Sequence, residues 1–312
     1  MNIAIAVNSR YIRYAYVMLY SLFSNNRSSK IRVYVLHQGL TEEDKRLLNS
    51  LAVEDIQKIE YLKIDMESRL MKLPITENWT REIYFRLLMG EVLPQIVNRV
   101  LYLDIDIIVH ASIKEFYNMD MQEMELAVAD DPMIQGNYSK EQKELFAEFG
   151  EELRYFNSGM ILYDLDKVRK RCCFEDYYRI AERAGYSLTN PDQDLLNYLH
   201  FGNVLYVDNT KYNVFSQNVS LNEETLSEMK IIHFAGRKPW KYSGVHYEME
   251  KIWWLYAKET PFYIEMMEEV FWNGLSDDSY QTIRALLQEN KELKESLNKA
   301  MELCQKLCGR ES

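Results

Sequence analysis

The chain has 312 residues, of which 47% are hydrophobic and 13% aromatic, so it is long enough to build one large buried core. Its 37 basic and 48 acidic residues give a net charge of -11, which argues against nucleic acid or an anionic membrane as a main partner, because both require a basic face. The opening MNIAIAVNSR has no basic stretch, and no run of 18 apolar residues occurs. We therefore expect a cytoplasmic protein with no signal peptide and no transmembrane helix.

The first half of the sequence alternates between strand-like and helix-like segments. We expect strands over residues 3–7, 31–37, 58–65 and 98–104. Apolar residues recur on one helical face of 11–24, Thr41 precedes the acids typical of a first helical turn, and Thr80 opens another helix. This alternation predicts an α/β fold, in which helices cover both faces of a mainly parallel sheet.

The second half continues with strands that we expect over residues 125–131, 158–165 and 229–235. Ser139 and Gln142 have the spacing of a helix capping box. Asn190 and Pro191 place a cap and a first-turn proline before the helical segment DQDLLNYLH.

The end of the chain has a different pattern. Ile283, Asn290, Leu297 and Cys304 occupy one heptad position, and Leu286, Leu293, Ala300 and Leu307 occupy a second. A single Asn in such a stripe can fix two-stranded pairing. Residues 277–308 could therefore form a dimerising coiled coil or a helix that docks on its own domain. We expect one domain over 1–272 and a helical tail over 273–312.

The run VLYLDIDIIVH places two carboxylates inside an apolar segment. If the strand continues, Asp104 and Asp106 point to the same side, at the carboxyl end where open α/β sheets bind ligands. An unpaired buried charge costs several kcal/mol, so a cation is expected beside them. Paired carboxylates suit Mg²⁺ or Mn²⁺, although the acids could also simply end a strand in solvent.

A second candidate cluster follows a late apolar run in HFAGRKPW. An imidazole from His233 that reached the two aspartates would favour Mn²⁺ over Mg²⁺. Gly236 permits close backbone approach, and Lys238 offers a positive charge for phosphate. The alternative is an ordinary turn with a structural histidine.

Four blocks in this order, YLDIDIIV, FNSGMILYDL, DQDLLN and HFAGRKPW, resemble the family-8 retaining glycosyltransferases, a family that includes glycogenin and bacterial enzymes of cell-surface glycans. The resemblance extends from Ile3 to about Trp240. It implies a GT-A fold and a UDP-sugar donor, usually UDP-glucose or UDP-galactose. It also implies a hexosyltransferase that acts on a glycan or another hydroxyl acceptor, in the cytoplasm or at the inner face of a membrane.

The resemblance also implies roles for individual residues. Asp104, Asp106 and His233 would bind Mn²⁺ or Mg²⁺. The donor would be held by Ala6, Asn8, Tyr11, Arg86, Asp104, Ile105, Gly236 and Lys238, with Tyr11 stacked on the base. Family members often carry an aspartate where Asn8 stands. The sugar and the reacting centre would meet Asp131, Asn157, Asp192 and Gln193, and Asp130 could replace Asp131 if the register slips by one.

Two other functions are compatible with these residues. One is a catalytically silent relative that serves as a binding or scaffold dimer. The other is self-glycosylation as in glycogenin, with a tyrosine of the chain as acceptor. The aromatic stretch over 210–256, which includes Phe215, Trp240, Tyr242 and Trp253, could face an acceptor sugar or form core. Gln193 could attack the sugar itself, or the acceptor could enter from the face of the leaving group.

Overall fold

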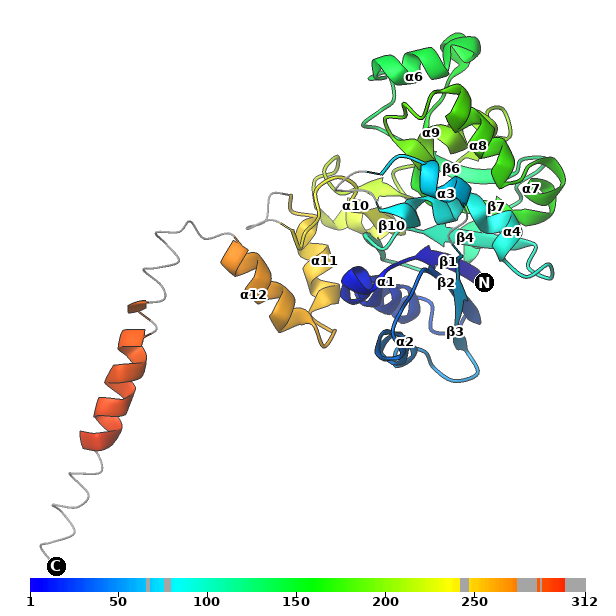
Figure 1. Cartoon of the computed structure of the whole chain (residues 1–312). Coiled ribbons are helices and arrows are strands. Elements are labelled where there is room, and N and C mark those ends of the chain that lie inside the picture. The colour runs from blue at the N-terminus through cyan, green and yellow to red at the C-terminus, as the bar shows by residue number, and fades with distance from the viewer. Residues whose placement is uncertain (66–67, 76–79, 242–246, 274–284, 287, 301–312) are drawn as a thin grey trace, which may run out of the picture.

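The computed structural model describes residues 1–65, 68–75, 80–241, 247–273, 285–286 and 288–300 (Figure 1). Seven strands form the central sheet in the order β3-β2-β1-β4-β7-β6-β8. They are β1 (Asn2–Ala6), β2 (Ile31–His37), β3 (Gln57–Lys63), β4 (Arg99–Leu103), β6 (Leu126–Asp130), β7 (Phe156–Asp164) and β8 (Val204–Tyr206). All pairings are parallel except those of β7, which runs antiparallel to β4 and β6. The predicted mainly parallel α/β sheet is confirmed.

Helices cover both faces of this sheet. Along β1, Ile3 and Ile5 join one buried cluster and Ala4 joins another, because successive side chains of a strand point to opposite faces. The first face packs against α1 (Ile12–Ser24), α2 (Glu42–Asn49) and α5 (Lys114–Tyr117). The second packs against α3 (Ser68–Lys72), η2 (Arg81–Leu88), α4 (Met89–Val92), α7 (Leu165–Arg171), α8 (Phe174–Arg183) and α9 (Pro191–Leu199).

A second, three-stranded sheet contains β5 (Ile107–Val109), β10 (Ile231–His233) and β9 (Val214–Phe215), with β10 in the middle. The expectation that Asp104 and Asp106 share one face of a continuing strand is therefore wrong. The strand β4 ends at Leu103, a turn follows, and β5 leaves to pair antiparallel with β10. The two aspartates lie at the junction between the sheets.

The remaining elements are short or lie near the end of the chain. They are η1 (Ser9–Tyr11), α6 (Lys140–Leu145), η3 (Ala147–Glu152), α10 (Glu223–Glu228), α11 (Glu250–Ala257) and α12 (Tyr263–Asn273). The helix α12 is tied to α1 by Arg13, whose guanidinium nitrogens lie 2.9 Å from Glu265 and 2.7 Å from Glu269.

The predicted C-terminal helix is present over residues 288–300, with two further helical residues at 285–286. Ile283, Cys304 and Leu307 of the predicted heptads lie outside the described residues. The boundary predicted between 272 and 273 stays a prediction. Among the described parts of the chain, none of the helices has the length and apolar character needed to span a bilayer.

Candidate active site

One cavity of about 850 Å³ opens at the carboxyl edge of β1 and β4. Every residue that the sequence singled out for donor, metal or sugar binding lines it. These are Ala6, Asn8, Tyr11, Arg86, Asp104, Ile105, Asp106, Asp131, Asn157, Asp192, Gln193, His233, Gly236 and Lys238. Because they come from both sheets, η1, η2 and α9, the fold brings together segments that are far apart in the sequence.

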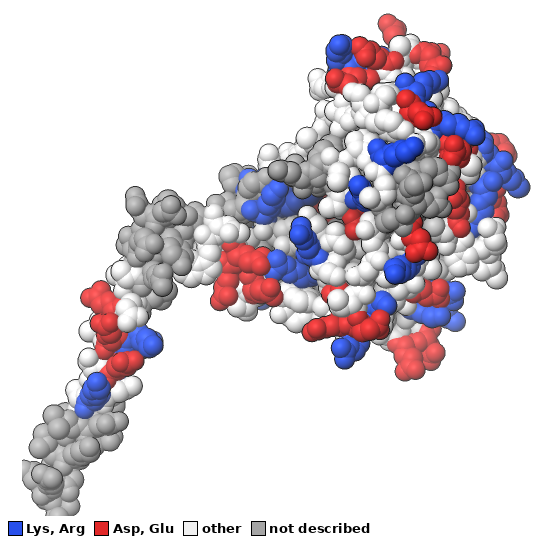
Figure 2. Space-filling model, in the orientation of Figure 1, with Lys and Arg blue, Asp and Glu red and all other residues white. Residues whose placement is uncertain are grey.

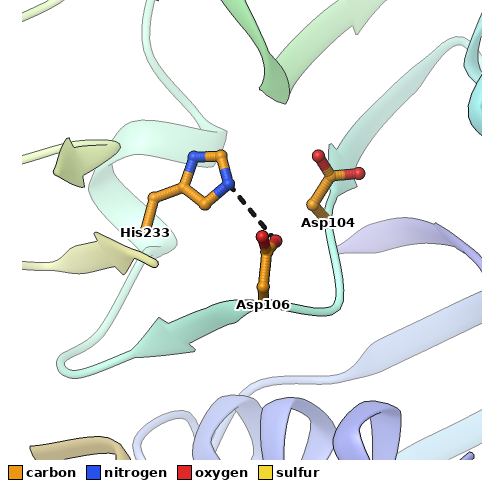
Figure 3. A group of neighbouring side chains, drawn as sticks. All are labelled: Asp104, Asp106 and His233. Atoms are coloured by element: carbon orange, nitrogen blue, oxygen red, sulfur yellow. Dashed lines mark ion pairs between the residues drawn. The ribbon is translucent and has the colours of Figure 1, made fainter. Parts of the chain in front are cut away.

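Asp104, Asp106 and His233 line this cavity, and their side chains lie beside one another (Figure 3). One ligand atom from each lies within 4.8 Å of the other two, and Nε2 of His233 lies 3.2 Å from Oδ1 of Asp106. Nδ1 of the same imidazole lies 2.8 Å from Oδ1 of the buried Asn213. A proton on Nδ1 would be donated to Asn213, which leaves the lone pair of Nε2 free for a cation.

Gly159 provides the space for these three side chains. A Cβ at this position would lie 2.4 Å from Cε1 of His233 and 2.9 Å from Oδ2 of Asp104, closer than real side chains approach. The position therefore accepts only glycine if the three ligands are to converge. Two hard oxygen ligands and one imidazole nitrogen fit a divalent cation, and the nitrogen favours Mn²⁺ over Mg²⁺.

Asp106 is buried between Lys238 and His233. Nζ of Lys238 donates to its Oδ2 and, at 3.1 Å, to the carbonyl oxygen of Phe234. Burial alone would raise the pKa of Asp106, but Lys238 and His233 outweigh it and hold this pKa well below its usual range. The carboxylate is therefore ionised at neutral pH, as a metal ligand must be.

Arg86 connects Asp104 to the α9 side of the cavity. Its guanidinium is 2.7 Å from Oδ1 of Asp104, 3.2 Å from Oδ2 of Asp192, and 2.8 Å from both the carbonyl and hydroxyl oxygens of Ser158. Tyr102 also donates to Asp104, at 3.0 Å. Burial raises the pKa of Asp192, although the positive charge of Arg86 opposes this shift.

Gln193, Asn157 and Asp131 form a buried hydrogen-bonded cluster. Nε2 of Gln193 donates to Oδ2 of Asp131 at 3.0 Å, while its Oε1 accepts from Nδ2 of Asn157 and the backbone N–H of Ser158 at 3.0 and 2.8 Å. These partners fix the orientation of the amide. Asp130 pairs instead with Arg154 and does not line the cavity, whereas Asp131 does.

Asp194, the second aspartate of DQD, has a different environment from Asp192. Its side chain is fully buried and accepts from Tyr155, Gln142 and the backbone N–H groups of Thr189 and Asn190, at 2.5 to 2.9 Å. Burial raises its pKa. Asp194 therefore holds the start of α9, and so positions its neighbours in the cavity.

The N-terminal wall of the cavity is aromatic and partly exposed. Asn8 uses its side-chain oxygen to cap η1 through the N–H of Arg10, and Tyr11 keeps 37% of its surface exposed. Trp240 stacks on Tyr14 with ring centres 4.2 Å apart. Of the aromatic stretch considered for the acceptor, Phe215 and Trp240 line the cavity, Trp253 is core, and Tyr242 lies outside the described residues.

The sequence model of glycosyl transferase family 8 matches residues 2–244. The chain belongs to this family. The family-8 chain is 25% identical to a lipopolysaccharide 1,2-glucosyltransferase of Escherichia coli K12 over 309 residues, which covers 95% of this chain and 85% of the relative. It is 28% identical to a lipopolysaccharide 1,3-galactosyltransferase of Salmonella typhimurium, with 78% and 74% of the two chains covered.

Among solved structures, the family-8 chain resembles the galactosyltransferase LgtC, crystallised with donor and acceptor sugar analogs. The TM-score is 0.73 at 22% identity, and the match covers 84% of this chain and 96% of LgtC. This likeness confirms the expected GT-A fold, and family membership confirms the expected enzyme class, a glycosyltransferase.

Three site residues were missed when the sequence was read by motif. Ser158 and Gly159 stand inside the quoted block FNSGMILYDL, so the signal was present but gave no role. Asn213 stands in no motif that we recognised, and only the folded structure places its amide between His233 and Asn157.

Proposed function

We propose that the chain is a metal-dependent retaining hexosyltransferase that moves glucose or galactose from a UDP-sugar to a hydroxyl group of a glycan in lipopolysaccharide synthesis. The observation that carries this proposal is the convergence of Asp104, Asp106 and His233 around the space left by Gly159, inside a cavity that also holds the Gln193 cluster. The names of the curated relatives support the substrate class.

The polar groups of the cavity match the charges of such a reaction. Asp104, Asp106 and His233 would hold Mn²⁺, and a bound divalent cation stabilises negative charge on a departing diphosphate. Lys238 adds a positive charge beside these three residues, where that charge develops. The exposed ring of Tyr11 offers a surface on which uracil can stack.

The sugar would meet the other side of the cavity. Asp131 and Asn157 offer an acceptor and a donor for sugar hydroxyls, and the amide of Gln193 is held rigidly between them. We infer that the acceptor oxygen bonds to the anomeric carbon on the face from which the diphosphate leaves. In this route the sugar–phosphate bond breaks, and the acceptor's proton passes to the diphosphate. Gln193 is an amide and a poor nucleophile, and it stabilises the positive sugar centre by its dipole.

The decisive test replaces both aspartates of the cluster. We expect Asp104→Asn with Asp106→Asn to abolish Mn²⁺ binding, measured by calorimetry, and turnover of UDP-glucose and UDP-galactose, including slow hydrolysis in water. The matched control is Asp164→Asn with Asp166→Asn, which has the same spacing but caps α7 outside the cavity. Turnover by the first double variant at the wild-type rate would refute the proposal.

Two measurements on wild-type protein separate the alternatives. Absence of turnover with every UDP-sugar would favour the silent relative. Hexoses added to the chain, seen by intact-mass spectrometry, would favour self-glycosylation. The cytoplasmic location stays a prediction.

A further inference from the structure

The helix over residues 288–300 presents an apolar stripe to solvent. Leu293 and Leu297 are each 60% exposed, and Leu286, two residues before this helix, is 52% exposed. With Asn290, these residues fall at steps of four, three and four, the spacing of the seam positions a and d of a coiled coil. An isolated helix of this length is marginally stable in water, so a partner on this stripe would stabilise it.

The charges on this helix favour a protein partner over a membrane. Residues 288–300 contain three glutamates and three lysines, which are interspersed along the helix (Figure 2). A surface of zero net charge gains little from anionic lipid, because electrostatic attraction to a bilayer requires an excess of Lys and Arg. The stripe therefore fits an apolar surface of matching length, flanked by complementary charges.

We propose that a second copy of the chain covers this stripe, as a parallel two-stranded coiled coil. Within residues 288–300, the charged residues that flank the seam are Glu289 at position g and Lys294 at position e, five residues later. In a parallel pair, position g of one helix lies beside the next position e of its partner, so each Glu289 meets Lys294 of the second copy, twice per dimer. An antiparallel pair places g beside g and e beside e, which opposes like charges.

Asn290 gives an independent reason for the same arrangement. It occupies seam position a between Leu286 and Leu293, both at d. A polar side chain at a is paired only when the two helices are parallel and in register, where the amide of Asn290 meets the same amide of the second copy. Such an Asn specifies two strands at a cost in stability.

The test measures the oligomeric state of the full chain by sedimentation equilibrium and light scattering. We expect wild-type protein to be a dimer, and Leu293→Glu with Leu297→Glu to be a monomer with unchanged melting temperature and UDP-sugar turnover. A wild-type chain that stays monomeric at every concentration loaded overturns the proposal. So does pelleting of wild type, but not of this variant, with vesicles of anionic phospholipid, because the stripe would then serve a membrane.

Charge reversal tests the orientation of the helices. We expect Glu289→Lys or Lys294→Glu alone to weaken dimerisation about tenfold, since each loses two inter-chain ion pairs and creates repulsion. The two reversals together should restore wild-type dimerisation. The matched control, Lys291→Glu with Glu292→Lys, changes the same charges at the outer positions b and c and should have no effect. Single reversals that leave the dimer unchanged overturn the parallel arrangement.

Discussion

Replacing Gly159 by alanine tests whether the convergence of Asp104, Asp106 and His233 serves metal binding. The added methyl group would lie 2.4 Å from Cε1 of His233, 2.9 Å from Oδ2 of Asp104 and 3.0 Å from Oδ1 of Asn157. Non-bonded carbon atoms prefer about 3.5–4.0 Å. The imidazole must therefore move by about 1 Å, whereas metal–ligand distances tolerate only about 0.2 Å.

The size of the effect follows from the cost of overpacking. Forcing a methyl group into a packed site costs about 1–3 kcal/mol, and a shift of the His233 ring is the route that relieves it. If the metal-bound state must bear this strain, Mn²⁺ binding weakens by roughly 5- to 150-fold, since 1.4 kcal/mol corresponds to a factor of ten. UDP-sugar turnover at limiting Mn²⁺ should fall in parallel.

The assay is a titration of free Mn²⁺ by electron paramagnetic resonance, with urea unfolding of the same samples. Gly39→Ala is the control, because a Cβ there would meet no atom within 4 Å. We expect wild-type Mn²⁺ affinity in this control. A Gly159→Ala protein that loses stability but keeps wild-type Mn²⁺ affinity would show that the glycine serves packing alone, and the reasoning about the site would be wrong.

Three further substitutions probe other parts of the chain. Arg86→Met leaves the carboxylates of Asp104 and Asp192 without their cation and should lower the free energy of unfolding by about 3–5 kcal/mol in urea; a loss below 1 kcal/mol would contradict this. Tyr11→Ala should weaken UDP binding roughly 5- to 150-fold by calorimetry without changing the melting temperature, and equal affinity would exclude stacking. Burial lowers the pKa of His200, so the stability that the neutral ring contributes is lost as pH falls below about 6.5, where the unfolded chain takes up the proton. His200→Gln should therefore make the free energy of unfolding in urea depend less on pH between 7 and 5. An unchanged pH dependence would refute this.

Much of the sheet could be predicted because buried strands appear in the sequence as short runs of apolar residues. Residues 31–37 read as a strand and form β2, and Ser139 with Gln142 forms the predicted capping box. Most of the site residues lie in the four ordered motifs, whereas Ala6, Asn8, Tyr11, Arg86 and Asp131 lie outside them and were assigned through the wider resemblance. One cavity collects them all. Their catalytic roles stay predictions.

The break after Leu103 could not be predicted, because the apolar residues on both sides of it satisfy the same strand pattern. Whether the chain continues in one sheet or leaves for another depends on β10, which lies more than 100 residues later and pairs with β5. Likewise, Thr80 was expected to open an ordinary helix, yet residues 81–88 form a 3₁₀ helix, in which Arg86 donates from its side chain to the carbonyl oxygen of Ile83. Such contacts appear only in the folded chain.

The position of the ligand cluster between two sheets has a consequence for local opening. Asp104 follows a strand of the large sheet, whereas His233 ends a strand of the small one. An ion that both residues bind would therefore link the two sheets. Opening of the small sheet would then require loss of the ion. The free energy of this opening should rise by RT ln(1 + [L]/Kd), where [L] is the concentration of the free ion and Kd is its dissociation constant. Amide hydrogens of residues 107–109 and 231–233 should accordingly exchange more slowly with deuterium when manganese is present, while those of β3, at the far edge of the large sheet, keep their rates.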